Sequence, residues 1–361
     1  MSTTTTDTAP AEAVLGRLFG AALGAAELFT VYLGDVHGIY RTIGETGPIT
    51  ATELADRTGV DLRYLVEWLQ SQAISGLLTI DGTEVWTDRY DLAPGVRETL
   101  IEPSNPYYAG GLAAIAPALG RAFPLLVDAF RTGAGVPYSA YGAEAVSAQE
   151  ALNRPAYVNS LVAEWVPAIP GLHELLSRGA RLADVGTGAG WSAIALAKAY
   201  PNVRVDGYDN DEDSISRARR NATEEGVADR VDFEVRDITA VAAAGTRYDV
   251  VTFFECLHDL AHPVEALTAA RDALAPGGSV IVMDERADDV LTTPGDEVQR
   301  FLAAASVVWC TPQGRVEPDS DVVGTMLRTT HLRHLADHAG FTQVDVLPID
   351  HPFWRFYQLT P

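Results

Sequence analysis

Basic residues are scarce in this chain of 361 residues. Lysine and arginine together number 26 against 49 aspartates and glutamates, so the formal net charge is −23, and Lys198 is the only lysine. A surface this acidic repels phosphate backbones and anionic lipid head groups. The composition therefore argues against a nucleic acid or a membrane as partner. It leaves small neutral or cationic molecules and other protein subunits open.

Cysteine is also scarce, with only Cys256 and Cys310. Two cysteines cannot build a dense disulfide framework, so we expect free thiols in a reducing, cytoplasmic compartment. The start of the chain, Met1–Ala9, has no basic residue and does not predict a signal peptide. The apolar run Leu18–Ala26 is too short to span a bilayer, and it predicts a buried or interface helix that begins near Pro10.

Two short helices are expected after residue 48. Thr50 stands three residues before Glu53, a capping-box pattern that predicts a helix over Thr52–Arg57. Asp61 is the expected N-cap of a second helix over Leu62–Ser75, on which leucines and valine recur at helical spacing.

The segment after this second helix predicts a hairpin that turns at Asp81-Gly82. Two helices followed by a hairpin predict a winged helix over residues 48–94. Acidic residues outnumber basic ones in this segment, so it has no electrostatic footprint for a duplex. We therefore expect residues 1–100 to form a helical, winged-helix domain for dimerisation, which predicts a homodimer.

Residues 101–179 are expected to be a helical linker that covers a pocket. Within this linker the loop Gly133–Gly142 is glycine-rich and aromatic, and it is a candidate lid. We expect its helices to be broken by the prolines Pro106, Pro117, Pro124, Pro137, Pro155, Pro167 and Pro170.

Residues 180–361 alternate between short apolar runs and helical patterns, which predicts an α/β fold with a parallel sheet. Helical segments are expected over about 296–310 and 329–339. The last two strands, Gln343–Leu347 and Phe356–Leu359, are joined by a turn so short that they must be antiparallel. The earlier strands are expected at Arg181–Val185, Val203–Tyr208, Val231–Val235, Tyr248–Phe253 and Ser279–Met283.

The first of these strands runs into a glycine-dense turn, Gly186-Thr-Gly-Ala-Gly190, and the turn opens a helix. Glycine can adopt positive φ and lets a ligand approach the backbone closely. The N-terminus of the helix points free N–H groups and a positive dipole end at the turn. This arrangement predicts a nucleotide or nucleoside cofactor.

Acidic residues follow the next two strands. Asp209 is placed to accept both hydroxyls of a ribose, and Asp237 suits an exocyclic amine, with Ile238 against an adenine face. Each could instead be an ordinary surface acid at the start of a helix, and Asp211 could simply cap the next helix. The acid after the third strand, the Pro-Gly-Gly turn before the fifth and the antiparallel closing pair favour S-adenosylmethionine over a nicotinamide dinucleotide.

Residues 181–361 resemble the class I S-adenosylmethionine-dependent methyltransferases, with a Rossmann-like seven-stranded sheet whose last strand is antiparallel. The acidic winged helix ahead of them resembles the dimerisation domain of small-molecule O-methyltransferases, and the whole chain resembles a bacterial branch of such enzymes. The segments that carry this resemblance are Val136–Gly142, Phe254–Asp259, Val282–Arg286 and Phe353–Tyr357. The resemblance implies cofactor contacts from Asp184, Gly186, Gly188, Asp209, Asn210, Asp237, Ile238 and Phe254, and Tyr141 is added to this set.

His258, with Asp259, falls where the small-molecule O-methyltransferases carry their His-Asp pair. If the acceptor is a hydroxyl, a base is needed, and a histidine suits that role. A histidine here could also serve packing alone. Glu255 is the second catalytic candidate, and Asp284 and Glu285 are candidates for the acid that orients the base. No metal is expected, because His331, His334 and His338 share a helix face without any further ligand pattern.

The sequence thus predicts a methyltransferase that acts on a small molecule, with oxygen as the favoured acceptor atom. Two alternatives stay open. The same fold could carry out a reaction other than methyl transfer, such as an intramolecular displacement or a cyclisation. The chain could also be a regulator that senses the cofactor through its winged helix without turnover.

Overall fold

The computed structural model describes residues 9–243, 245–317 and 319–361. The chain divides into two compact units, Met1–Pro117 and Ala118–Pro361, and each is described by itself. The finer division into three parts, with boundaries at residues 100 and 179, stays a prediction. The prediction that Met1–Ala9 is not a signal peptide concerns residues that lie, apart from Ala9, outside those that the structure describes.

The first unit holds the expected helix pair, α3 (Ala51–Thr58) and α4 (Leu62–Ile74), after α1 (Ala9–Val36) and α2 (Ile39–Thr46). A small antiparallel sheet follows in the order β1-β3-β2, and α5 ends the series at Val96–Leu100. Its core contains Ile43, Leu54, Leu65, Leu69 and Tyr90. The strands are β1 (Ile49–Thr50), β2 (Leu78–Ile80) and β3 (Arg89–Leu92).

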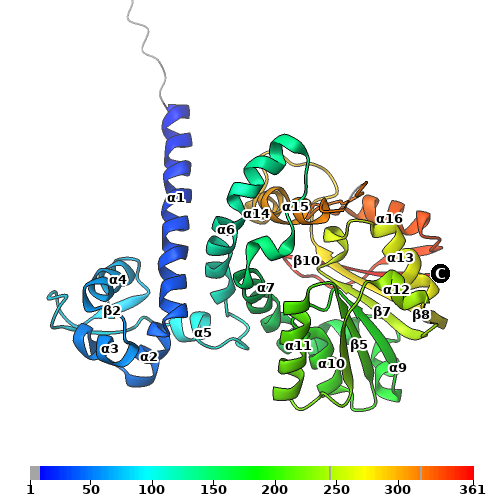
Figure 1. Cartoon of the computed structure of the whole chain (residues 1–361), viewed down its shortest axis with the longest axis horizontal. Helices are drawn as coiled ribbons and strands as arrows, with labels where there is room; N and C mark the ends of the chain where they lie inside the picture. The colour runs from blue at the N-terminus through cyan, green and yellow to red at the C-terminus, as the bar shows by residue number, and fades with distance from the viewer. Residues whose placement is uncertain (1–8, 244, 318) are drawn as a thin grey trace, which may run out of the picture. The chain divides into compact units, whose positions relative to one another are not determined.

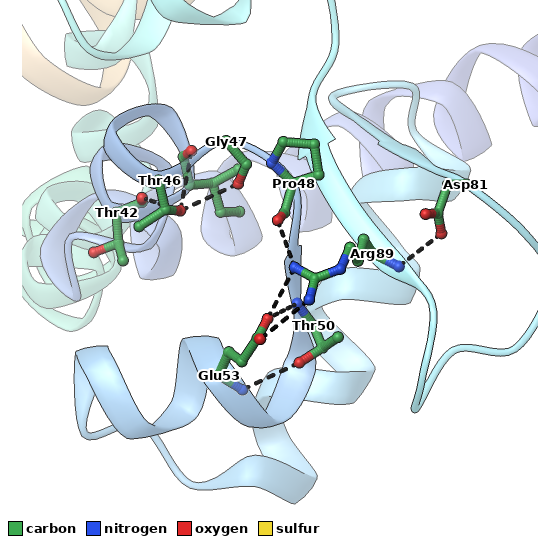
Figure 2. Close-up of polar contacts among 9 residues, drawn as sticks. Thr42, Thr46, Gly47, Pro48, Thr50, Glu53, Asp81 and Arg89 are labelled. Carbon is green, nitrogen blue, oxygen red and sulfur yellow. Dashed lines mark hydrogen bonds and ion pairs between the residues drawn. The ribbon is translucent and has the colours of Figure 1, made fainter.

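The capping box is confirmed. The Thr50 hydroxyl accepts from the Glu53 N–H at 3.3 Å, and the Glu53 carboxylate accepts from the Thr50 N–H at 3.0 Å. Arg89 of β3 forms an ion pair with Glu53 at 3.1 Å and donates to the Pro48 carbonyl at 2.8 Å (Figure 2). The start of α3 is therefore fixed both by its own cap and by the neighbouring strand.

We expect Thr50→Ala to lower the free energy of unfolding by about 1 kcal/mol, because it leaves the Glu53 N–H without its acceptor. Thr46→Ala is the matched control, since the Thr46 hydroxyl donates to carbonyls at the end of α2, such as those of Thr42 and Gly47, and caps no N–H group (Figure 2). Urea unfolding of both variants measures the difference. Equal stability of the two variants would contradict the role of the cap.

The predicted hairpin is present, but its tight turn at Asp81-Gly82 is wrong. Residues 81–88 form a longer connection, and β3 begins only at Arg89. The reason is Tyr90, which is fully buried opposite Ile80 and whose hydroxyl donates to the Val85 carbonyl at 3.1 Å. Burying Tyr90 sets the register, and the residues before it loop out. Strand β1 was not predicted.

Helix α1 confirms the helix predicted to begin near Pro10. Its apolar side chains are exposed, so the alternative of a buried helix is wrong. Leu15, Leu18 and Phe19 are 67%, 58% and 70% exposed, so of the two alternatives only the interface helix remains open. Among the described residues, α1 and α6 (Gly110–Thr132) are long and apolar enough to cross a membrane. A core helix of a soluble protein or an N-terminal signal sequence passes the same test.

Several predicted helix breaks are also wrong, and two of them lie in α6, which runs through Pro117 and Pro124. Pro124 has no N–H, so the carbonyl of Gly120, one turn earlier, lacks its usual donor within the helix. Gly120 is exposed, and water can donate to that carbonyl instead. Pro155 likewise lies inside a helix, α7 (Ala143–Ala156). Directly after it the chain widens into the π-helix η2 (Tyr157–Trp165).

The second unit is built on a seven-stranded sheet in the order β6-β5-β4-β7-β8-β10-β9. Its neighbouring strands are parallel, except that β10 is antiparallel to both β8 and β9. The predicted fold class and antiparallel closing pair are thus confirmed. The strands are β4 (Arg181–Val185), β5 (Arg204–Asp209), β6 (Val231–Val235), β7 (Tyr248–Phe254), β8 (Leu274–Glu285), β9 (Gln343–Val346) and β10 (Trp354–Thr360).

Helices cover both faces of this sheet (Figure 1). One hydrophobic cluster joins the sheet to η2, α9 (Leu172–Arg178), α10 (Trp191–Ala199) and α11 (Glu212–Glu224). A second cluster joins the other face to α12 (Ile238–Ala243), α13 (Pro263–Asp272) and α16 (Thr329–His338). The remaining short elements are η1 (Tyr138–Tyr141), α8 (Val166–Ala168), η3 (Leu257–Asp259), α14 (Glu297–Ala305), η4 (Ser306–Cys310) and α15 (Thr311–Gly314).

The order of the strands reverses between β4 and β7, since β5 and β6 lie on one side of β4 and β8 lies beyond β7. In open α/β sheets, ligands bind outside the carboxyl ends of the strands at such a switch point. The residues that end β4, β5 and β7 are therefore the place to look for a site.

Candidate functional site

The glycine turn after β4 adopts the conformation that its sequence predicts. Gly186, Gly188 and Gly190 have φ values of +66°, +52° and +82°. A Cβ on Gly186 would lie 2.7 Å from the Cys256 Sγ, and a Cβ on Gly190 would lie 2.6 Å from the Phe233 ring. A Cβ on Gly188 would meet nothing within 4 Å. Packing thus requires two of the glycines, while the third borders open space that a ligand can enter.

Asp184 lies beneath this turn and supports it. Its carboxylate accepts hydrogen bonds from Ser192 and Thr252 at 2.6 Å and from Thr187 at 2.8 Å. The residue is 2% exposed, and burial raises its pKa although the three hydroxyls oppose the shift. Because these hydroxyls already occupy the carboxylate, the side chain is placed to hold the turn and not to reach a ligand directly.

Asp209, at the end of β5, is joined to the turn. Its carboxylate accepts from the Gly188 N–H and from the Asp211 N–H, both at 2.9 Å. Burial raises the pKa of Asp209 to about 6, although these backbone bonds oppose the shift. The neighbouring Asn210 is exposed. Asp211 caps α11 by accepting from the Ser214 N–H at 2.8 Å, so the capping alternative holds for that residue.

Asp237 and Ile238 follow β6 at the same edge of the sheet. Asp237 is exposed, and its carboxylate accepts from the Thr239 N–H at 2.8 Å and from the Thr239 hydroxyl at 2.5 Å. Ile238 is buried in the hydrophobic cluster under α12 and α13. Asp237 is therefore the more accessible of the two, and a contact between Ile238 and a ligand stays a prediction.

The two aromatic candidates differ in what they contact. Phe254, at the end of β7, stacks on Tyr157 of η2 with ring centroids 6.1 Å apart. Tyr141 is fully buried, lies 4.7 Å from the Trp309 ring, and donates its hydroxyl to the Val308 carbonyl at 2.8 Å. Tyr141 therefore holds the segment of η1 against η4, so a ligand contact through its hydroxyl is not supported by this geometry.

His258 lies between carboxylates on both sides of its ring. Its Nδ1 is 2.9 Å from Asp284 and 3.0 Å from Glu285, and its Nε2 is 3.3 Å from Asp259. The residue is 2% exposed. Burial alone would lower the imidazole pKa, but the three carboxylates together raise it well above its usual value. The carboxylates therefore favour the protonated ring, and the role of a general base stays a prediction.

Asp284 and Glu285, the two candidates for an orienting acid, do contact His258. They end β8, while His258 lies in η3 after the adjacent strand β7, so strand pairing brings them together. Burial raises the pKa of Glu285, and the charge of Asp284 adds to the shift. The histidine and its carboxylates thus form one ionic cluster on the wall of the candidate site.

Glu255 joins this cluster from the end of β7. It has a left-handed backbone with φ of +54°, and the Trp354 indole donates to its carboxylate. Burial raises the pKa of Glu255, and the charge of Glu285 raises it further. Trp354 was not predicted for the site. It reaches this place because β10 pairs it with Glu285, a register that no local sequence pattern shows.

These residues fit a nucleoside cofactor. The open space at Gly188, the bond between Asp209 and the turn, and the N-terminus of α10 meet at the switch point of the sheet. Fold and site together define a class I methyltransferase domain, the class that uses S-adenosylmethionine.

Comparison with known proteins agrees with this class. Residues 176–328 match the family described as "Methyltransferase domain". A ubiquinone biosynthesis O-methyltransferase from Cereibacter sphaeroides (strain KD131) is 37% identical over 103 residues, a match that spans 28% of this chain and 40% of that protein.

Solved structures resemble nearly the whole chain. A mitomycin 7-O-methyltransferase superposes with a TM-score of 0.67 at 19% identity, covering 98% of this chain and all of the other. Human N-acetylserotonin methyltransferase in complex with S-adenosylmethionine superposes with a TM-score of 0.70 at 16% identity, covering 100% of this chain and 99% of the other. At these identities the likeness shows the shared fold.

Proposed function

We propose that this protein is an S-adenosylmethionine-dependent O-methyltransferase that acts on a small molecule in specialised metabolism. The observation that carries the proposal is the Asp209 carboxylate, which is bonded to the N–H of Gly188 where the sheet switches direction. The match of residues 176–328 to the methyltransferase domain supports it. The mitomycin 7-O-methyltransferase and the human N-acetylserotonin methyltransferase share the fold over nearly their full length.

In this proposal the strand ends hold the cofactor, which supplies a methyl group already activated on a sulfonium. Asp209 accepts the ribose hydroxyls with Asn210 beside it, Asp237 accepts from the adenine amine, and Gly188 gives the cofactor room. Asp184 and Gly186 shape the turn from below, and Phe254 borders it at the end of β7.

The acceptor lies beside the cluster of His258 and its carboxylates. A hydroxyl acceptor must lose its proton as it attacks, and a group near it must take that proton. His258 can do so only when its ring is neutral, with Asp284 holding the other ring nitrogen. The proton is therefore accommodated by the cluster as a unit, with Glu255 and Glu285 as the groups whose raised pKa lets them hold it.

Product analysis tests the proposal. The full-length protein is incubated with methyl-labelled S-adenosylmethionine and a panel of phenols, and the products are separated by mass spectrometry. Adenosylhomocysteine together with a labelled methyl ether supports methyl transfer to oxygen. Methylthioadenosine would instead show an intramolecular displacement. Binding without any product would favour a sensor of the cofactor.

We also propose a cytoplasmic homodimer formed through a winged-helix N-terminal unit. The exposed apolar side chains of α1 support this, as do the helix pair and hairpin of that unit. Light scattering on the purified chain gives its mass directly. A monomer at all concentrations up to the micromolar range would contradict the dimer.

Cofactor affinity should depend on pH through Asp209. Its pKa is raised to about 6, so above that pH the ionised carboxylate can accept both ribose hydroxyls, and below it a proton blocks one acceptor. We expect the affinity for adenosylhomocysteine to be constant above pH 7 and to fall by up to about tenfold per pH unit below 6. Calorimetry from pH 5 to 8 measures this profile. Asp209→Asn is the control and should show no such fall, so an identical slope in that variant would assign the titration to another group.

A further inference from the structure

The ionic cluster around His258 holds more carboxyl groups than its one ring could balance if all of them were ionised. Four carboxylates meet there, from Glu255, Asp259, Asp284 and Glu285. Within the residues that the structure describes, the ion pairs of Asp259, Asp284 and Glu285 all have His258 as their partner. Buried charges are tolerated only when they are compensated. The cluster therefore calls for protons or for an additional cation.

The Nδ1 side of the ring has the geometry of a ligand set. The His258 Nδ1, an oxygen of Asp284 and an oxygen of Glu285 lie within 4.8 Å of one another. The nitrogen is 2.9 Å and 3.0 Å from the two oxygens. Donor atoms that share a cation at about 2.1 Å are separated by roughly 3 Å, so the spacing fits a metal with little movement.

A second observation points to the same place. Oδ2 of Asp284, the oxygen that is not bonded to the His258 ring, is buried without any hydrogen-bond partner, and Asp284 is 0% exposed. Oε2 of Glu285 is buried without a hydrogen-bond partner as well, although it lies beside the ring nitrogen. A buried carboxylate oxygen without a partner is unfavourable, and a cation bound to these two carboxylates would compensate their charge.

The other side of the ring is a weaker candidate. There Nε2 faces Asp259 and Cys310, which lie close enough to form a second set. The Asp259 side chain is 20% exposed, however, against 1% for Asp284 and 11% for Glu285. The Asp259 oxygen nearest Nε2, Oδ1, is also buried without a hydrogen-bond partner, but the rest of that side chain reaches water, which balances part of its charge.

We infer that His258, Asp284 and Glu285 bind a divalent cation. One imidazole with two carboxylates suits an ion such as Mn²⁺ or Zn²⁺, which accept nitrogen and oxygen ligands together. The ion would replace the proton that the ring and Asp284 otherwise share. This site does not depend on the proposed methyl transfer. It also revises the expectation of no metal, which considered only histidines that share one helix.

Metal binding to the purified full-length protein tests this inference directly, without cofactor or acceptor. After treatment with EDTA and dialysis, calorimetry with Mn²⁺ alone and with Zn²⁺ alone should show one ion per chain for at least one of the two metals. Electron paramagnetic resonance of the Mn²⁺ form and the absorption spectrum of a Co²⁺ form report the ligands. Wild-type protein that takes up less than about one tenth of an equivalent of either metal at millimolar concentration would overturn the site.

Variants then locate the ion. We expect Asp284→Asn and Glu285→Gln each to weaken binding by on the order of 100-fold, since loss of even an outer partner of a ligand costs about 10- to 100-fold. Asp259→Asn and Cys310→Ser are the matched controls and should leave the affinity within about threefold of wild type. Loss of binding in these controls with retention in Asp284→Asn would overturn the assigned ligand set. If a variant fails to fold, the Co²⁺ spectrum of the wild type still decides whether a nitrogen ligand is present.

Because these measurements involve no turnover, they separate the two proposals. A protein that binds the ion but yields no methylated product would support the metal site and contradict the proposed function. A protein that methylates a phenol with undiminished rate and binds neither metal would do the reverse.

Discussion

His258→Ala should lower the turnover number by about 100-fold or more and leave the affinity for the cofactor unchanged. The ring is proposed to take the proton of the acceptor before the cluster shares it, and loss of a general base typically costs this much. The cofactor residues follow β4, β5 and β6, and their contacts do not include the ring. Steady-state kinetics with the acceptor found by product analysis, together with calorimetry for adenosylhomocysteine, measures both quantities.

The same variant should also lose stability. Removing the ring leaves Asp284 and Glu285 buried beside each other without a positive partner, and breaking a buried ion pair in this way costs about 3–5 kcal/mol. Urea unfolding gives this value, and intact cofactor binding shows that the variant is folded in the assay.

Two further variants distinguish chemistry from positioning. His258→Asn can still donate to Asp284 but cannot accept a proton at neutral pH, so it should recover part of the stability that His258→Ala loses and none of its turnover. His262→Ala removes a partly exposed histidine that pairs only with Glu317 at 3.5 Å, and it should change neither quantity measurably. Full turnover in His258→Asn would show that the ring only positions its neighbours.

Much of the fold could be predicted because its signals are local. The capping box at Thr50 depends on two residues of one helical turn, and the strand Arg181–Val185 depends on a short apolar run that ends at glycines. Strand ends also place Asp209 and Asp237 at one edge, because parallel strands align their carboxyl ends. Local pattern and tertiary structure agree at these positions.

Other features depend on packing across the sequence and could not be predicted. The hairpin loops out before Arg89 because Tyr90 is buried in a core that residues from α2 to α5 share. Pro124 does not break α6, since the carbonyl of the exposed Gly120 can turn to water. A proline or a turn residue favours a local backbone conformation, and the packing of the whole unit decides whether the chain adopts it.

The cluster at His258 shows the same limit for function. The sequence indicates the histidine and both candidate acids, but the charge of the ring depends on Asp284 and Glu285 arriving together at its Nδ1 through strand pairing. Trp354 reaches Glu255 only through the register of β10. The identity of the residues was therefore predictable, while their protonation was not.

Asp209→Ala should weaken binding of adenosylhomocysteine by roughly 2–3 kcal/mol, which is about 30- to 150-fold. The ionised carboxylate is proposed to accept both ribose hydroxyls, and hydrogen bonds to a charged group contribute about 1.5–3 kcal/mol each. The variant also frees the N–H of Gly188, so the turn loses the bond that joins it to β5. Calorimetry at pH 7.5, where the wild-type carboxylate is ionised, measures the change.

Asp211→Ala is the matched control for this effect, because Asp211 lies two residues away and caps α11 through the Ser214 N–H. We expect that control to lose about 1 kcal/mol of stability and to keep its affinity for the ligand. Asp237→Ala, at the next strand end, should weaken binding less than Asp209→Ala, since Asp237 is exposed and already bonded to Thr239. Wild-type affinity in Asp209→Ala would mean that the carboxylate only shapes the turn, and the ribose would then have to be held from elsewhere.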